Sequence, residues 1–123
     1  MFCSIDHPSP QILCKIDFHN AFNCVRRDIF LNRVLSDFPK VFPFVNQCYR
    51  QQSLLSFGDF RIDSAEGVQQ GDPLGPLLFC LAIAPITKQL SSCLNLWYLD
   101  DGFLAGDPST VLSDLSTVFS LSN

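Results

Sequence analysis

Residues 94–102 read Leu94-Asn95-Leu96-Trp97-Tyr98-Leu99-Asp100-Asp101-Gly102 and place two adjacent carboxylates after an apolar run. Neighbouring strand residues point to opposite faces, so Asp100 and Asp101 cannot both be buried on one side of a sheet. Asp-Gly is a strong hairpin signal. We therefore predict strands at residues 95–99 and 103–105 with a turn at Asp101-Gly102. Acids at a tight turn can face a metal ion instead of a core.

The surrounding chain predicts alternating strands and helices. Hydrophobic periodicity and turn signals indicate a strand at 12–18, helices at 26–37 and 41–51, a hairpin of 53–57 and 60–62 turning at Gly58-Asp59, a helix from Pro73 to about 90, and a last helix from Asp107-Pro108 with Val111, Leu112, Leu115, Val118 and Phe119 on one face. Residues 1–10 show little pattern, and we expect an irregular or disordered end. This order predicts an α+β fold, with a small antiparallel sheet and helices packed on one face.

Composition bounds the class of protein. The chain has 123 residues, 47% of them hydrophobic, which excludes disorder and fits one domain at most. Its formal net charge of −4 is wrong for a free-standing nucleic-acid binder, which normally has a basic face. The most apolar run, 77–86, is shorter than the roughly 20 residues of a membrane span, and we predict a buried core helix. The start shows no signal-peptide pattern. We expect an intracellular protein, in cytoplasm or nucleus.

The six cysteines, at positions 3, 14, 24, 48, 80 and 93, show no C-x-x-C spacing. Zinc knuckles and dithiol redox motifs use that spacing, so neither is indicated. We expect reduced thiols scattered through an intracellular protein.

A third carboxylate, Asp17, stands near the end of the first predicted strand. In a small sheet, the strands that carry Asp17 and Asp100-Asp101 can be neighbours. Three carboxylates at adjacent strand ends are a hard-oxygen ligand set that suits Mg²⁺ or Mn²⁺. A solvated turn and a strand-end acid or helix cap are the alternative interpretations.

A glycine-rich loop precedes the long helix. It reads Gly67-Val68-Gln69-Gln70-Gly71-Asp72-Pro73-Leu74-Gly75-Pro76. Glycines allow a substrate close to the backbone, and a helix start offers free N–H groups to a phosphate or a base edge. Gln70 could hydrogen-bond a template or a nucleotide. The alternative is an ordinary hairpin-to-helix loop in which Asp72 is the N-cap.

Three motifs in order resemble motifs A, B and C of reverse transcriptases, which are RNA-directed DNA polymerases. They are Lys15-Ile16-Asp17-Phe18-His19-Asn20-Ala21-Phe22-Asn23 with Val25 and Arg27, the loop at 67–76, and Tyr98-Leu99-Asp100-Asp101-Gly102. Each motif alone could arise by chance, but their order and spacing are specific. The chain resembles the palm of a non-LTR (LINE-like) reverse transcriptase over about residues 11–120.

The resemblance implies a two-metal site for Mg²⁺ or Mn²⁺. Asp17 would be the motif A ligand and Asp100 the first motif C ligand. Asp101 would support the metals or the primer end, and the carbonyl of Phe18 would complete one coordination shell. RNA template, DNA primer and deoxynucleotide are the implied partners, with no membrane.

The resemblance also implies substrate contacts at three further residues. Phe22 would be an aromatic steric gate against a ribose 2′-OH, although it could simply be a core residue. Gln70 and Gly71 would lie beside the templating pair and the incoming nucleotide. Arg27 could contact a phosphate, or pair with Asp28 or another acid on a solvated face.

Departures from the family pattern limit the expected activity. Asn23 stands where many relatives have Asp, and about ten residues precede motif A. We expect a partial palm at 11–123 without fingers or thumb. One interpretation is therefore a polymerase fragment, and the alternative is a catalytically inactive relic or co-opted piece. Tyr98 and Phe22 disfavour an enzyme that copies RNA into RNA.

Overall fold

The computed structural model describes residues 10–121, so the irregular end predicted for residues 1–10 lies outside the described residues except at residue 10. The described chain forms two compact units. The first comprises the residues up to His19 and from Ile83 onward, and the second comprises Asn20–Ala82. Each unit has its own buried apolar cluster, and each is described below by itself.

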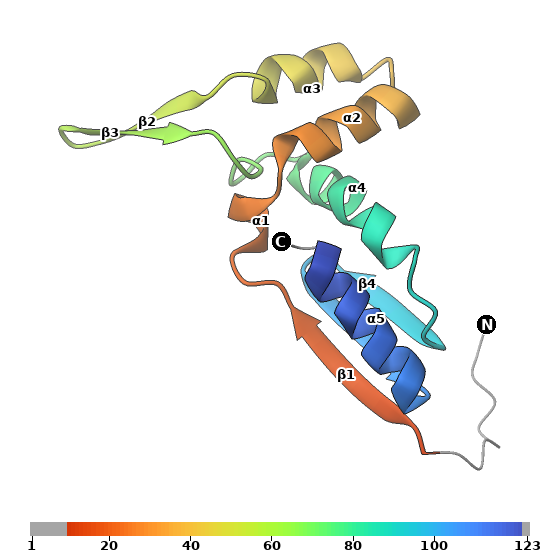
Figure 1. Ribbon diagram of the computed structural model, residues 1–123. Helices are drawn as coiled ribbons and strands as arrows, with labels where there is room; N and C mark the ends of the chain where they lie inside the picture. Colours follow the sequence, from red (N-terminus) through yellow and green to blue (C-terminus); the bar gives the residue numbers. More distant parts are fainter. Residues whose placement is uncertain (1–9, 122–123) are drawn as a thin grey trace. The chain divides into compact units, whose positions relative to one another are not determined.

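The first unit is a three-stranded antiparallel sheet covered by a helix (Figure 1). Its strands are β1 (Ile12–Asp17), β5 (Asp101–Gly106) and β4 (Leu94–Tyr98), in the order β1-β5-β4. Helix α5 (Pro108–Leu121) packs on one face, where Ile16 and Leu104 meet Val111 and Val118 in a buried cluster. The predicted strands and last helix are confirmed, as is the α+β class.

The β4–β5 turn lies two residues before its predicted position. Tyr98 pairs with Asp101, so Leu99 and Asp100 form the turn, and Leu99 adopts a positive φ of 55°. Gly102 is instead a strand residue opposite Trp97. A Cβ on Gly102 would lie 2.5 Å from the Trp97 ring. The prediction of a turn at Asp101-Gly102 is wrong because this glycine admits an aromatic ring, not a reversal of the chain.

Helix α5 buries a carboxylate that its apolar pattern does not reveal. Asp107 caps the helix as predicted, accepting a bond from the Ser109 N–H at 3.1 Å. Leu112 and Phe119, predicted on the inner face, are 59% and 62% exposed. Asp114 is buried instead.

The Asp114 carboxylate holds the loop before β4. It accepts hydrogen bonds from the backbone N–H groups of Ser91 (2.9 Å) and Ser92 (2.6 Å) and from the Ser92 hydroxyl (2.5 Å). Burial alone would raise the pKa of Asp114, but these bonds hold the pKa below its ordinary value. The inner face of α5 is therefore partly polar.

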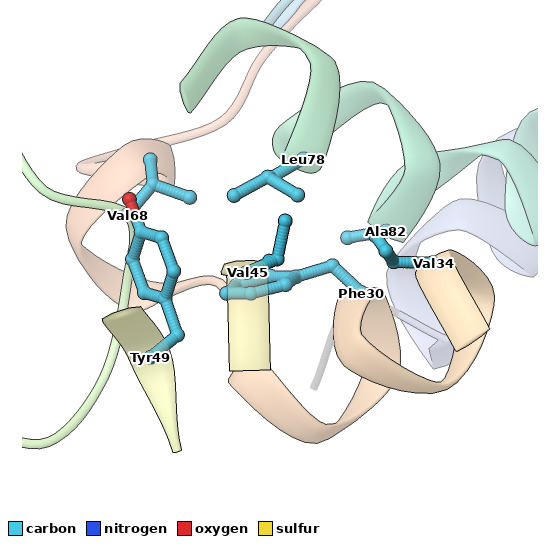
Figure 2. Packing of buried hydrophobic residues seen from close by; sticks show 7 residues of the cluster. All are labelled: Phe30, Val34, Val45, Tyr49, Val68, Leu78 and Ala82. Atoms are coloured by element: carbon cyan, nitrogen blue, oxygen red, sulfur yellow. The ribbon is translucent and has the colours of Figure 1, made fainter. Parts of the chain in front are cut away.

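The second unit joins helices to a hairpin. Its elements are α1 (Ala21–Cys24), α2 (Arg27–Asp37), α3 (Phe42–Tyr49), β2 (Ser53–Phe57), β3 (Phe60–Ser64) and the first part of α4 (Gly75–Thr87). The predictions of α2, α3 and the hairpin are confirmed. Helix α1 is absent from the predictions because four residues are too few to show a helical period. Figure 2 shows the buried cluster, which gathers Phe30, Val34, Val45, Tyr49, Val68, Leu78 and Ala82.

Helix α4 begins at Gly75, two residues later than predicted. Asp72 accepts a bond from the Leu74 N–H at 2.8 Å and its carbonyl accepts one from Gly75 at 2.9 Å. These bonds place Pro73 in a turn before the helix. Leu78, Phe79 and Ala82 are buried, which confirms the predicted core helix. None of the helices between residues 10 and 121 has the length and apolar character to cross a bilayer.

The cysteines differ in part from the expectation of reduced thiols. Cys14, Cys24, Cys48 and Cys80 are free thiols. Cys93 is disulfide-bonded, so the prediction is wrong for Cys93.

Gly102→Ala tests the close approach of Trp97. The added methyl must displace a packed ring, and we expect the free energy of unfolding to fall by about 1–3 kcal/mol. Urea denaturation followed by Trp97 fluorescence measures the change. Gly75→Ala is the matched control, because its Cβ would meet only ordinary contacts at 3.7 Å or more. A Gly102→Ala variant as stable as this control would contradict the packing argument.

Asp114 predicts a pH dependence of stability. Its folded pKa lies below the unfolded value of about 3.9, so its contribution is present above that value. It is lost as pH falls through the folded pKa. We expect Asp114→Asn to lower the stability at pH 7 by about 1–3 kcal/mol and to flatten the decline below pH 4. Equal slopes for the two proteins in acid denaturation would contradict this role.

Candidate functional site

Asp17 and Asp101 face each other across two strands. The β1–β5 register pairs Asp17 with Asp101 and Ile16 with Gly102. Because Ile16 and Leu104 point into the core under α5, alternation puts Asp17 and Asp101 together on the opposite face of the sheet. Like charges directly opposite one another are destabilising. A cation at this position would remove that repulsion.

Asp100 joins this edge through the backbone. It stands in the turn after Leu99, and its carbonyl accepts a hydrogen bond from the Phe18 N–H at 3.2 Å. This bond continues the β1–β5 pairing past the strand end. Leu99 in a left-handed conformation is unusual for a non-glycine residue. The three predicted acids therefore lie at the same end of the β1–β5 strand pair.

Phe18 contributes its ring to packing. The ring stacks on Trp97 with centroids 5.6 Å apart and an interplanar angle of 18°, and it contacts the first unit's core. The ring is therefore part of the packing, and the carbonyl oxygen is the atom of Phe18 that could bind a metal ion.

The ligand types fit a hard divalent cation, although the carboxylates are not gathered around one point. Within residues 10–121 no three His, Cys, Asp or Glu side chains are grouped to hold a metal. The Asp101 Oδ1 lies 3.0 Å from the Lys15 Nζ and pairs with it. Oxygen ligands on adjacent rigid strands suit Mg²⁺ or Mn²⁺. To become such a ligand, the Asp101 carboxylate must leave its ion pair with Lys15.

Phe22, Gln70 and Gly71 share a pocket in the second unit. This pocket has a volume of about 270 Å³, and its other lining residues are Val68, Gln69, Asp72, Gly75 and Pro76. The Phe22 ring is half-buried and stacks on Phe79, with centroids 4.7 Å apart and planes 13° apart. Phe22 is therefore both a core contact and a wall of the pocket.

Gln70 and Gly71 form the open rim of the pocket. Gln70 is exposed, and its Nε2 donates to Asn23 Oδ1 at 3.3 Å. Gly71 has a φ of 84°, and a Cβ added to it would have no atom within 4 Å. Its backbone is therefore open to a close approach.

Gly67 fixes the start of the glycine-rich loop against α1. Its φ is 71°, and a Cβ there would lie 2.5 Å from the Asn23 carbonyl oxygen and 2.6 Å from that of Phe22. The N–H of Gly67 donates to the Val25 carbonyl at 2.9 Å, and that of Val68 donates to Phe22 at 2.8 Å. Only glycine fits here, so Gly67 ties the chain after Phe22 to the loop that carries Gln70.

Arg27 has a structural position that its sequence context does not reveal. It is buried, and its guanidinium donates to the carbonyls of Gly67 (2.9 Å), Ser64 (3.0 Å) and Glu66 (3.0 Å), and to the Ser64 hydroxyl (3.1 Å). The interpretation of Arg27 as half of a solvated ion pair is wrong, while its phosphate contact stays a prediction. Asp28 pairs instead with Arg26 at 2.6 Å.

Tyr49 supports the same loop. Its hydroxyl donates to the Asp72 carboxylate and accepts a bond from the Gln69 N–H at 3.2 Å. Burial, together with the Asp72 carboxylate, raises the pKa of Tyr49 to about 12. The tyrosine therefore stays protonated and can donate this bond at neutral pH. Nothing in the sequence around Tyr49 signals this role.

Arg27→Lys tests the clamp on the loop. Lysine keeps the charge but cannot reach four acceptors, and we expect a loss of roughly 2–4 kcal/mol in unfolding free energy. Urea denaturation followed by far-UV circular dichroism measures it. Arg26→Lys is the matched control, since an exposed pair contributes about 1 kcal/mol or less. Equal losses at both positions would refute the clamp.

A family model described as reverse transcriptase (RNA-dependent DNA polymerase) matches residues 3–120. A comparison with curated proteins finds no match.

Proposed function

The chain belongs to the reverse transcriptase family, and we propose that it carries the metal-binding part of an RNA-directed DNA polymerase site. The reaction would join a deoxynucleotide to a primer 3′-OH opposite an RNA template. The observation that carries this proposal is the β1–β5 register, which sets Asp17 opposite Asp101 with Asp100 in the adjoining turn.

Asp17, Asp100, Asp101 and the Phe18 carbonyl would hold the metal ions. Two divalent ions held there would supply activation of the primer hydroxyl and neutralisation of the triphosphate. The chain's contribution is to fix Asp17 and Asp101 on strands whose inner faces are locked by Ile16 and Leu104, with Asp100 in the turn between β4 and β5. Rigid support of this kind is what a preorganised site requires.

Phe22, Gln70 and Gly71 would contact the nucleotide and the templating base. Phe79 supports the Phe22 ring from behind, so the ring can resist displacement and crowd a ribose 2′-OH. The amide of Gln70 is exposed at the pocket rim and can hydrogen-bond a base. The motif sequences favour a non-LTR element as the source.

Two observations favour the alternative of a catalytically inactive relic or co-opted fragment. The acids do not form a three-ligand group in the described residues, and Lys15 occupies Asp101. We therefore expect the isolated chain to extend a DNA primer on an RNA template weakly or not at all.

Metal binding tests the proposed site without requiring catalysis. We expect the chain to bind Mn²⁺ and Asp100→Asn to weaken this binding at least about tenfold, because loss of even an outer-shell partner of a metal ligand typically costs about that much. Calorimetric titration measures the affinity. Asp59→Asn, at the β2–β3 hairpin tip, is the charge-matched control and should bind as the parent does. A parent chain that binds no Mn²⁺ would overturn the proposed site.

Primer extension with Mn²⁺ and deoxynucleotides separates the two alternatives. Robust synthesis that Asp100→Asn abolishes would refute the inactive fragment. Mn²⁺ binding without synthesis would support it and leave the metal site intact.

A further inference from the structure

Lys15 lies on the same sheet face as Asp17 and Asp101 and next to them. It precedes Asp17 by two residues on β1, so both side chains leave the strand on one face. Its cross-strand partner is Phe103, and its Nζ lies 5.9 Å from the centre of that ring. The same nitrogen lies 3.0 Å from Asp101 Oδ1.

All three predicted acids act on this ammonium. The hydrogen bond and charge of Asp101 are the main causes that raise the pKa of Lys15, and Asp17 and Asp100 raise it further. Over residues 10–121, the other ion pairs are Arg26–Asp28 and Arg33–Asp37, both in the second unit. Among the described residues of the first unit, Lys15 is thus the cation that forms an ion pair with one of the three predicted acids, Asp101.

We propose that Lys15 is the built-in counter-ion of the metal site, and that it must release Asp101 when a divalent cation binds. This inference rests on the proposed function. Lys15 is a positioning residue here, because it acts through Asp101, whose Oδ1 lies 3.0 Å from its Nζ. The ammonium reduces repulsion between Asp17 and Asp101 without metal, and it competes with the metal for Asp101.

The competition predicts the direction of a charge-removing substitution. Lys15→Met should bind Mn²⁺ about two- to fivefold more tightly than the parent, which corresponds to the strength of one exposed ion pair. Lys15→Arg keeps the ion pair and should bind as the parent does. Lys88→Met is the control for net charge, since it removes a lysine elsewhere in the first unit.

Calorimetric Mn²⁺ titration of these four proteins, each checked by near-UV circular dichroism, gives distinct outcomes. Tighter binding by Lys15→Met alone supports the inference. Equal or weaker binding by Lys15→Met, with the parent still binding, overturns the inference and leaves the proposed function standing. If neither the parent nor Lys15→Met binds Mn²⁺, the inference and the proposed function are both overturned.

A measurement on the parent chain avoids dependence on a variant's folding. Mg²⁺ titration followed by NMR of the lysine side chains should shift the Lys15 Nζ resonance and leave Lys88 unchanged. An unmoved Lys15 signal at saturating Mg²⁺ would overturn the inference.

Discussion

The antiparallel pairing of β1 with β5 is the constraint on which the candidate site depends. A slip of one residue would turn Ile16 outward and Asp17 toward α5. Burial of Ile16 beside Leu104 and against α5 makes that slip costly, since Ile16 would enter water and Asp17 would enter the core. The same packing that stabilises the first unit therefore sets Asp17 opposite Asp101.

The second unit positions its candidate residues by polar contacts around an apolar cluster. Gly67 brings two backbone segments closer than any side chain would permit. Arg27 and Tyr49 then satisfy the polar groups that this approach buries. Gln70 and Gly71 line the pocket and stay exposed, because the hydrogen bonds of Arg27 and Tyr49 go to Gly67 and Gln69 instead. Such a loop can be rigid at its base and still admit a ligand.

Periodicity and motif order predict the elements of this fold and the edge at which the acids lie. The failures occur where a tertiary contact overrides a local signal. Gly102 has the local signal of a turn residue, yet the Trp97 ring occupies the space that a side chain at this position would fill. Arg27 reads as a surface charge and Asp114 draws no prediction at all, yet each is buried among hydrogen-bond partners far along the chain. Sequence patterns carry no information on such long-range partners, so these roles could be found only in the folded structure.

The location of bound Mn²⁺ tests the central claim most directly. Paramagnetic broadening of backbone amide signals at substoichiometric Mn²⁺ reports which residues surround the ion. The account predicts strongest broadening at Asp17, Phe18, Asp100 and Asp101, with Asp59–Asp63 of the hairpin little affected. Strongest broadening at the hairpin, or uniform broadening along the chain, would contradict the claim that strand register builds a metal site.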